Sequence, residues 1–236
     1  MSSRTSSFPP ASEPVDAPHP RPAPLPPAGQ GGTPPRTSPQ SEGNWAGQPL
    51  RRVVGRTAVL AQPHIDTDRI IPARFLTTTV RGDLGRHLFA DWRFDGDGRA
   101  RPEFALNRPE AEGAVVLVTG DNFGCGSSRE HAVWALRDFG FQAVVSTSFS
   151  DIFRQNALKN GLLPVAIDVV THRRLLAAPG VEVEIDVAAA ELRLADGSGT
   201  PFPLDPFARH CLLHGIDELG YLVAQDEAIA RFERAR

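Results

Sequence analysis

A glycine-rich turn between a strand-like run and a helix-like run is the feature that most constrains the fold of this chain. The apolar, β-branched run at 114–119 predicts a buried strand, and the run Glu130–Phe139 predicts a helix. The turn between them contains Gly120, Gly124 and Gly126. Glycines let the backbone turn tightly and approach a ligand closely. The sequence therefore predicts a strand–turn–helix unit whose turn is a candidate binding site.

The residues at the end of this turn suit a small oxyanion. Ser127, Ser128 and Arg129 stand where the helix is predicted to begin. The first turn of a helix offers unpaired N–H groups and a partial positive charge, and both favour anions. A guanidinium group also binds a carboxylate through two parallel hydrogen bonds. We therefore predict a carboxylate-binding site at these three residues.

Other interpretations of the turn compete with this one. Ser127 and Glu130 fit the capping box S-x-x-E, in which case Ser127 would only cap the helix and Arg129 would be a solvated surface charge. A phosphate-binding loop is disfavoured because no lysine follows the glycines, and Arg129 breaks the nucleotide fingerprint G-x-G-x-x-G. Cys125 would be a nucleophile if His131 served as its base, whereas the simpler interpretation is a small residue in a tight turn.

The turn and several further motifs resemble those of a known protein family, and they occur in the same order along the chain. The run 122–131, followed by Trp-Ala-Leu at 134–136, is similar to the signature of the small subunits of 3-isopropylmalate dehydratase, the isopropylmalate isomerase of leucine biosynthesis in the aconitase family. Val133 departs from the usual proline, but valine is ordinary in a first helical turn. The resemblance runs from about residue 50 to the C-terminus. The other matching stretches are 64–72, 75–76, 87–94, 148–153, 159–164, 207–211 and 215–220.

The resemblance implies a reversible dehydration and rehydration. 3-Isopropylmalate would lose water to give 2-isopropylmaleate, and water would return the other way round to give 2-isopropylmalate. By the same resemblance Ser127 is the general base. Ser128 would bind substrate or hold Ser127 in place, and Arg129 would clamp a substrate carboxylate.

The resemblance also places Thr67 and Asp68 at the edge of the site as substrate-binding residues. The alternative for Asp66 and Asp68 is a pair that caps a turn. Aconitase carries a further substrate-binding arginine shortly after this motif. Both Arg74 and Arg81 are near enough in the sequence to correspond to it.

The implied Lewis acid is a four-iron–four-sulfur cluster held by the large subunit. The two cysteines of this chain, Cys125 and Cys211, are too few for the usual four-thiolate ligation. We therefore expect no metal or cofactor on this chain, and activity only as a heterodimer with the large subunit on a small dicarboxylate substrate. The alternatives are the small subunit of a related homoaconitate or methyl-substituted malate/maleate hydro-lyase, and a non-catalytic binding module. The stretch 76–88 is the expected substrate loop.

The first 48 residues differ in composition from the rest. They are rich in proline, serine and glycine and offer little for a core, so we predict a disordered Pro-rich tail over 1–48 and one domain over 49–236. The tail lacks the apolar region of a secretory signal. The net charge of −3 gives no footprint for nucleic acid, and no apolar run is long enough for a membrane span. We expect a cytoplasmic protein that binds neither nucleic acid nor a membrane.

The remaining pattern predicts a mixed α/β domain. The resemblance implies the swivelling β/β/α domain of the aconitase family's C-terminal part. The predicted helices are at 151–160, closed by Gly161, and at 171–177, 206–215 and 225–234. The predicted strands are at 142–147 and 162–167, with an antiparallel hairpin at 181–187 and 191–194.

Overall fold

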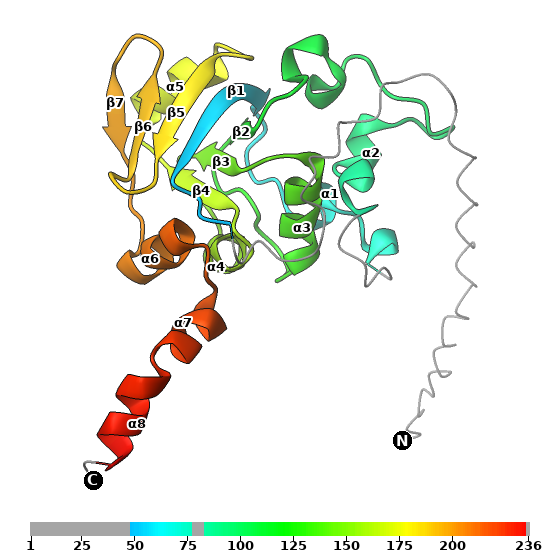
Figure 1. Cartoon of the computed structure of the whole chain (residues 1–236). Coiled ribbons are helices and arrows are strands. Elements are labelled where there is room, and N and C mark those ends of the chain that lie inside the picture. The colour runs from blue at the N-terminus through cyan, green and yellow to red at the C-terminus, as the bar shows by residue number, and fades with distance from the viewer. Residues whose placement is uncertain (1–47, 77–82, 235–236) are drawn as a thin grey trace, which may run out of the picture. The chain divides into compact units, whose positions relative to one another are not determined.

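The core of the molecule is a mixed sheet of seven strands, ordered β4-β3-β2-β1-β5-β6-β7 (Figure 1). The structure is a computed structural model that describes residues 48–76 and 83–234. The parallel half consists of β1 (Arg52–Leu60), β2 (Val116–Thr119), β3 (Ala143–Ser146) and β4 (Leu163–Ala166). The antiparallel half adds β5 (Glu182–Asp186), β6 (Glu191–Leu194) and β7 (Gly199–Pro201).

Strand β1 belongs to both halves of the sheet. Its first part, from Arg52 to Arg56, pairs antiparallel with β5, and its second part, from Thr57 to Leu60, pairs parallel with β2. Gly55 lies next to this change of partner with a φ of +155°. A Cβ atom there would lie 2.7 Å from Cγ2 of Val115. Glycine therefore permits the close approach of the two segments.

Two apolar clusters cover the two faces of the sheet. Successive strand residues point to opposite faces, so Leu117 and Val144 join one cluster and Val116 and Val145 the other. The second cluster includes residues of α5 (Val169–Leu176) and α6 (Pro206–His214). The first draws on α3 (Glu130–Phe139), α4 (Asp151–Lys159) and the short helices α1 (Thr67–Ile70), η1 (Ala73–Phe75), α2 (Ala90–Arg93), η4 (Ala105–Asn107) and η5 (Pro109–Ala111). It also includes Leu84 and Leu88, which flank η3 (Gly85–His87).

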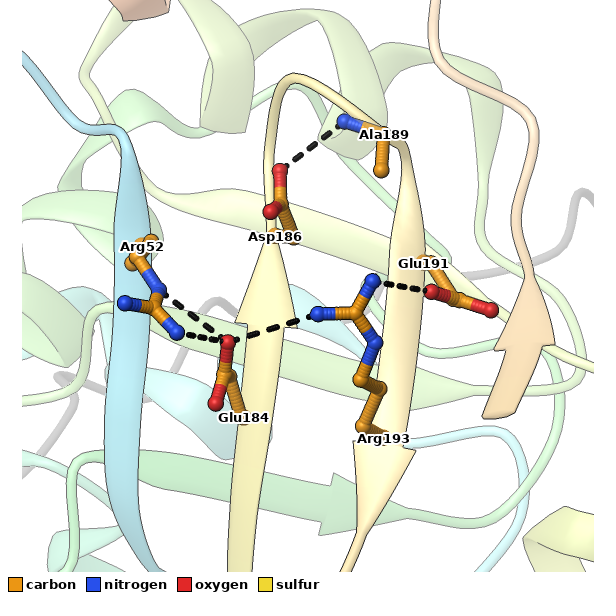
Figure 2. A network of polar contacts seen from close by, with 6 residues as sticks. All are labelled: Arg52, Glu184, Asp186, Ala189, Glu191 and Arg193. Carbon is orange, nitrogen blue, oxygen red and sulfur yellow. Dashed lines mark hydrogen bonds and ion pairs between the residues drawn. The ribbon is translucent and has the colours of Figure 1, made fainter. Parts of the chain in front are cut away.

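The antiparallel half presents a charged ladder on one face (Figure 2). Arg52 and Arg193 both pair with Glu184, and Arg193 also pairs with Glu191 at 2.6 Å. The opposite face of the same strands carries Val53, Ile185 and Leu192 into the second cluster. This alternation confirms the predicted hairpin with one hydrated face.

Most predicted elements are confirmed within one or two residues, and the predicted helix Glu130–Phe139 has the observed bounds. The prediction that Gly161 caps α4 is off by one residue, because Asn160 is the C-cap and Gly161 follows it with a φ of +68°. The C-terminal region holds α7 (Glu218–Ala224) as well as the expected α8 (Asp226–Arg234). The tail predicted at 1–48 lies, apart from residue 48, outside the described residues. No helix in the described ranges is long and apolar enough to cross a membrane.

Candidate functional site

Two loops that leave the carboxyl ends of neighbouring parallel strands form the candidate site. The loop after β1 carries the Thr-Asp motif, and the loop after β2 carries the glycine-rich turn. Ligand sites of α/β sheets typically lie at this edge. The loops run side by side and are joined by three backbone hydrogen bonds, from His64 N to Asp121 O at 2.8 Å, from Gly124 N to Ile65 O at 2.8 Å and from Thr67 N to Cys125 O at 3.0 Å.

The glycine-rich turn is pressed against α4. Gly124 has a φ of +73°, and a Cβ atom built on it would lie 2.2 Å from Cγ of Phe153. The ring of Phe153 also packs edge-on against Phe123, with ring centroids 5.1 Å apart. Any side chain at Gly124 would therefore displace the turn from the helix beneath it. This contact explains why the turn requires a glycine at this position.

Thr67 and Ser127 face each other across the two loops. Thr67 Oγ1 donates to the Ser127 carbonyl oxygen at 3.0 Å and lies 3.3 Å from Ser127 Oγ. Thr67 is 2 % exposed, whereas Ser127 and Ser128 are exposed. A threonine hydroxyl has one proton, and here the carbonyl oxygen accepts it, so Ser127 Oγ is the donor in the second contact. The structure thus brings a buried hydroxyl against the predicted base.

Arg129 and Asp68 form an ion pair between the same two loops. Nη1 of Arg129 donates to Oδ1 of Asp68. The Arg129 side chain is 23 % exposed and that of Asp68 is 55 % exposed. A guanidinium group has five N–H donors, so this contact leaves most of the fork for a second carboxylate. The four residues predicted from two distant motifs therefore form two contacting pairs, Thr67 with Ser127 and Asp68 with Arg129, and Ser128 lies in the same turn.

Comparison with known proteins shows the family. Residues 48–169 match the aconitase C-terminal domain. The chain is 59% identical over 189 residues to the 3-isopropylmalate dehydratase small subunit of Anaeromyxobacter dehalogenans, covering 80% of this chain and 99% of that one. The chain belongs to the family of 3-isopropylmalate dehydratase small subunits. This membership confirms the predicted family and the swivelling aconitase-type fold.

Two further relatives agree. The small subunit from Roseiflexus sp. (strain RS-1) is 52% identical over 193 residues, covering 80% of this chain and 95% of that one. A crystal structure of 3-isopropylmalate dehydratase from Methanocaldococcus jannaschii superposes with a TM-score of 0.58 at 30% identity, covering 76% of this chain and 98% of that one. Both sequence and structure thus place the chain in the dehydratase small-subunit family.

The capping-box interpretation of Ser127 and Glu130 is wrong for this family member. Helix α3 begins at Glu130 with Arg129 as its N-cap, two residues after Ser127. The Glu130 carboxylate instead accepts a hydrogen bond from Asn160 Nδ2 at 3.3 Å. The left-handed Gly126, with a φ of +91°, and the extended Arg129 delay the start of the helix. Ser127 is therefore available for a role other than capping.

The alternative of two capping aspartates holds for only one of them. Asp66 is the N-cap of α1, and its Oδ1 accepts a hydrogen bond from the Arg69 N–H at 2.7 Å. Asp68 instead faces Arg129. Side chains two positions apart do not face each other on a helix. The Asp66 carboxylate therefore caps the helix, whereas the Asp68 carboxylate points toward the site.

Cys125 does not have the surroundings of a catalytic nucleophile. Its thiol donates to the backbone oxygen of His64 at 3.5 Å, while the ring of His131 packs against Trp134 with centroids 4.6 Å apart. Burial raises the pKa of the Cys125 thiol, and the carboxylate of Asp66 adds to the shift. A raised pKa disfavours the reactive thiolate. The simpler interpretation, a small residue in a tight turn, fits the structure.

The residues of this chain do not fit an iron–sulfur cluster. Cys125 lies in the site turn, whereas Cys211 is buried in the second apolar cluster beneath the sheet. Across residues 48–76 and 83–234, no group of three or more His, Cys, Asp or Glu side chains could hold a metal ion. Four thiolates are the usual ligands of such clusters.

Of the two candidate substrate-binding arginines after the Thr-Asp motif, the structure describes only Arg74. Arg74 pairs with Asp91 and lies over the ring of Phe75, 4.6 Å from its centroid. Arg81 lies outside the described residues, as do residues 77–82 of the predicted substrate loop.

The sequence pattern predicted no role for three residues that lie in the matching motifs, His64, Asn122 and Ser148. Ser148 Oγ accepts a hydrogen bond from the Asn122 N–H at 2.8 Å.

Proposed function

We propose that this chain is the small subunit of a heterodimeric isopropylmalate isomerase of the cytoplasm, active only when bound to a large subunit. The function predicted from the sequence is confirmed at the level of the family, since the curated relatives carry the name of the dehydratase small subunit. Those names do not favour the homoaconitate or methyl-substituted malate alternative. The four-iron–four-sulfur cluster belongs to the large subunit in this proposal, and neither nucleic acid nor a membrane is a partner.

The observation that carries the proposal is the exposure of Ser127 beside a buried hydroxyl and an arginine. Dehydration chemistry benefits from a site that excludes water. Ser127, Ser128 and Asp68 are all exposed in the isolated chain. A second protein surface that covers this edge of the sheet would complete the site, and the shared small-subunit name indicates what supplies it.

In this proposal Ser127 removes the carbon-bound proton as an alkoxide and becomes a hydroxyl, and it returns a proton in the hydration direction. A serine is a poor base unless its alkoxide is stabilised. Thr67 Oγ1 lies 3.3 Å from Ser127 Oγ, and rotation of its proton from the carbonyl oxygen would make it a donor to the alkoxide. The N-terminal end of α3 and the Arg129 charge add further stabilisation.

Arg129 binds a substrate carboxylate, and Asp68 acts on substrate binding through Arg129. A carboxylate in direct contact with a dicarboxylate substrate would repel it. The ion pair instead holds the guanidinium group in one orientation. An oriented fork can present two parallel hydrogen bonds to a carboxylate. Ser128 contributes a hydroxyl to the same substrate from the neighbouring position.

The test is reconstitution under anaerobic conditions. Each subunit is purified alone and as the co-expressed complex, and iron, sulfide and turnover of isopropylmalate, homoaconitate and methyl-substituted malates are measured. We expect iron only with the large subunit and isomerase activity only in the complex, with isopropylmalate preferred. A stoichiometric cluster or turnover in the isolated small chain would refute the heterodimer, and a preference for homoaconitate would favour the alternative substrate class.

A further inference from the structure

Two residues with left-handed backbones face each other at one end of the candidate site. His64 has a φ of +54° and Asn122 a φ of +53°. Asn122 Nδ2 lies 3.0 Å from His64 Nδ1. Residues other than glycine adopt this conformation at a cost, and they retain it where the surrounding contacts enforce it, often at functional sites. A matched pair of such residues, one on each site loop, therefore calls for a physical role.

The pair stands at the first connection between the two loops. His64 N donates to Asp121 O, and the next connections run from Gly124 N to Ile65 O and from Thr67 N to Cys125 O. Asp66 and Cys125 form an isolated parallel bridge within the same segment. The last contact in the series is that between Thr67 and Ser127. A slip in register at the His64–Asn122 end would therefore be transmitted to the Thr67–Ser127 end.

Asn122 is also fixed from a third segment, the loop between β3 and α4. Its N–H donates to Ser148 Oγ at 2.8 Å, and the neighbouring Phe123 N–H donates to Ser148 O at 3.2 Å. Ser146 Oγ donates to Gly120 O at 2.7 Å. The end of β3 and the loop after it thus fix the loop that carries Asn122. The side-chain contact with His64 then fixes the Thr-Asp loop relative to the loop of Asn122.

We propose that His64 and Asn122 form a positioning pair that fixes the register of the two loops and so holds Thr67 Oγ1 against Ser127 Oγ. The amide nitrogen of Asn122 donates, and the unprotonated Nδ1 of His64 accepts. Within residues 48–76 and 83–234 no hydrogen bond joins either side chain to Ser127, so the pair acts through the backbone of the loops. The inference rests on the proposed function, because it assigns the pair's importance to the geometry of the proposed base.

The test uses glycine variants, which remove the side-chain contact and relieve the backbone at once. His64→Gly and Asn122→Gly are each measured in the reconstituted complex. We expect an unchanged or higher Tm, a KM for isopropylmalate within about twofold, and a kcat that falls about 10- to 100-fold, because small misplacements of reacting groups are costly. A structural role alone would lower Tm and leave kcat intact.

Two matched controls accompany these variants. His64→Asn should restore kcat to within about threefold, since asparagine tolerates the left-handed region and its side-chain oxygen can accept from Asn122. Ala190→Gly relieves a similar φ of +52° in the β5–β6 turn and should leave kcat unchanged. Wild-type kcat in both glycine variants, or a loss that His64→Asn does not restore, would overturn the proposal.

A second readout separates this proposal from the proposed function. In NMR spectra of the full chain alone, the amide resonances of Thr67 and Ser127 should move in His64→Gly and return in His64→Asn. Unmoved resonances would overturn the positioning pair whatever the activity. Conversely, moved resonances in a chain whose wild-type complex turns over no isopropylmalate would support the pair and reject the isomerase assignment.

Discussion

At the scale of residues, burial divides the hydroxyl groups of the site into two kinds. Thr67 is almost fully buried and makes its contacts within the protein, whereas Ser127 and Ser128 are exposed at the edge of the sheet. A buried hydroxyl contributes to stability through its hydrogen bonds, while exposed hydroxyls contribute little to stability and are free to meet a substrate. The two kinds of residue should therefore respond differently to substitution.

Ser127→Ala should lower kcat about 10²- to 10⁴-fold in the reconstituted complex, the usual contribution of a positioned proton-transfer group. The free energy of unfolding should change by no more than about 0.5 kcal/mol, because the side chain is exposed and does not cap α3. Steady-state kinetics and urea unfolding measure the two quantities. Ser128→Ala is the matched control and should affect KM more than kcat. Near-normal turnover in Ser127→Ala would remove the catalytic assignment.

Arg129→Lys should reduce kcat/KM about 10- to 100-fold, because lysine keeps the charge but loses the fork, and hydrogen bonds to charged groups contribute about 1.5–3 kcal/mol. Asp68→Asn should have a smaller effect, mainly on KM, since it keeps an acceptor for Arg129 while losing the charge. The double variant should be less impaired than the product of the two single effects predicts. Independent, multiplicative effects would show that Asp68 does not act through Arg129.

The glycine turn, the serines and Arg129 were predicted from the sequence pattern, because each residue type carries its chemistry wherever it lies, whereas the Thr-Asp motif was implied by the family resemblance. The start of α3 at Glu130 followed from the pattern, but its N-cap did not, since the backbone angles at Gly126 and Arg129 make Arg129 rather than Ser127 the N-cap. The contact between His64 and Asn122 joins residues far apart in the sequence. No local pattern reports such a contact.

At the scale of elements, periodic segments were predictable and interrupted ones were not. The hairpin strands β5 and β6 alternate apolar and polar residues, so their faces follow from the sequence. Strand β1 was missed because Gly55 and its arginines break the apolar pattern and because its two halves pair with different strands. Strand β7 has three residues and ends in proline, and α7 contains Gly220, so neither carries a strong local signal.

The contact between η1 and η3 should make stability depend on pH. The ring of His87 stacks on Phe75 with centroids 3.9 Å apart. Burial, followed by the charges of Arg86, Arg74 and Arg93, lowers the pKa of His87 from 6.5 to about 4. His87 is protonated below about pH 6.5 in the unfolded chain but only below about pH 4 in the folded chain. The stabilisation is therefore complete above pH 6.5 and is lost as the pH falls toward 4.

His87→Phe removes this titration and keeps the stacked ring. Thermal unfolding of the isolated chain between pH 7 and pH 4 should show a smaller fall in Tm for His87→Phe than for the wild type. Carboxylates titrate in the same range, but they are common to both proteins and cancel in the difference. Parallel curves for the two proteins would show that His87 does not contribute.

At the scale of the whole molecule, the fold is carried by the region shared with the family. The Anaeromyxobacter dehalogenans relative is covered over 99% of its length by 80% of this chain. Deleting residues 2–46 should therefore leave Tm and the kcat of the reconstituted complex nearly unchanged, because a segment with few apolar residues contributes little to a core. Thermal unfolding and isomerase assays of the shortened chain check this. A lost transition or failure to bind the large subunit would assign the segment a structural role.

The shared strand β1 has a consequence for synthesis on the ribosome. Arg52 and its partner Glu184 on β5 are separated by 132 residues, and translation adds about 5–20 residues per second. The edge of β1 that pairs with β5 is thus synthesised roughly 7–26 s before that strand. We expect Arg52→Val to raise the insoluble fraction on expression while leaving the Tm of the soluble protein nearly unchanged, since exposed ion pairs contribute little. The arginines and Gly55 interrupt the apolar pattern of β1, so the strand is not predicted from the sequence. The same residues make the unpaired strand a poor template for aggregation until β5 has been synthesised.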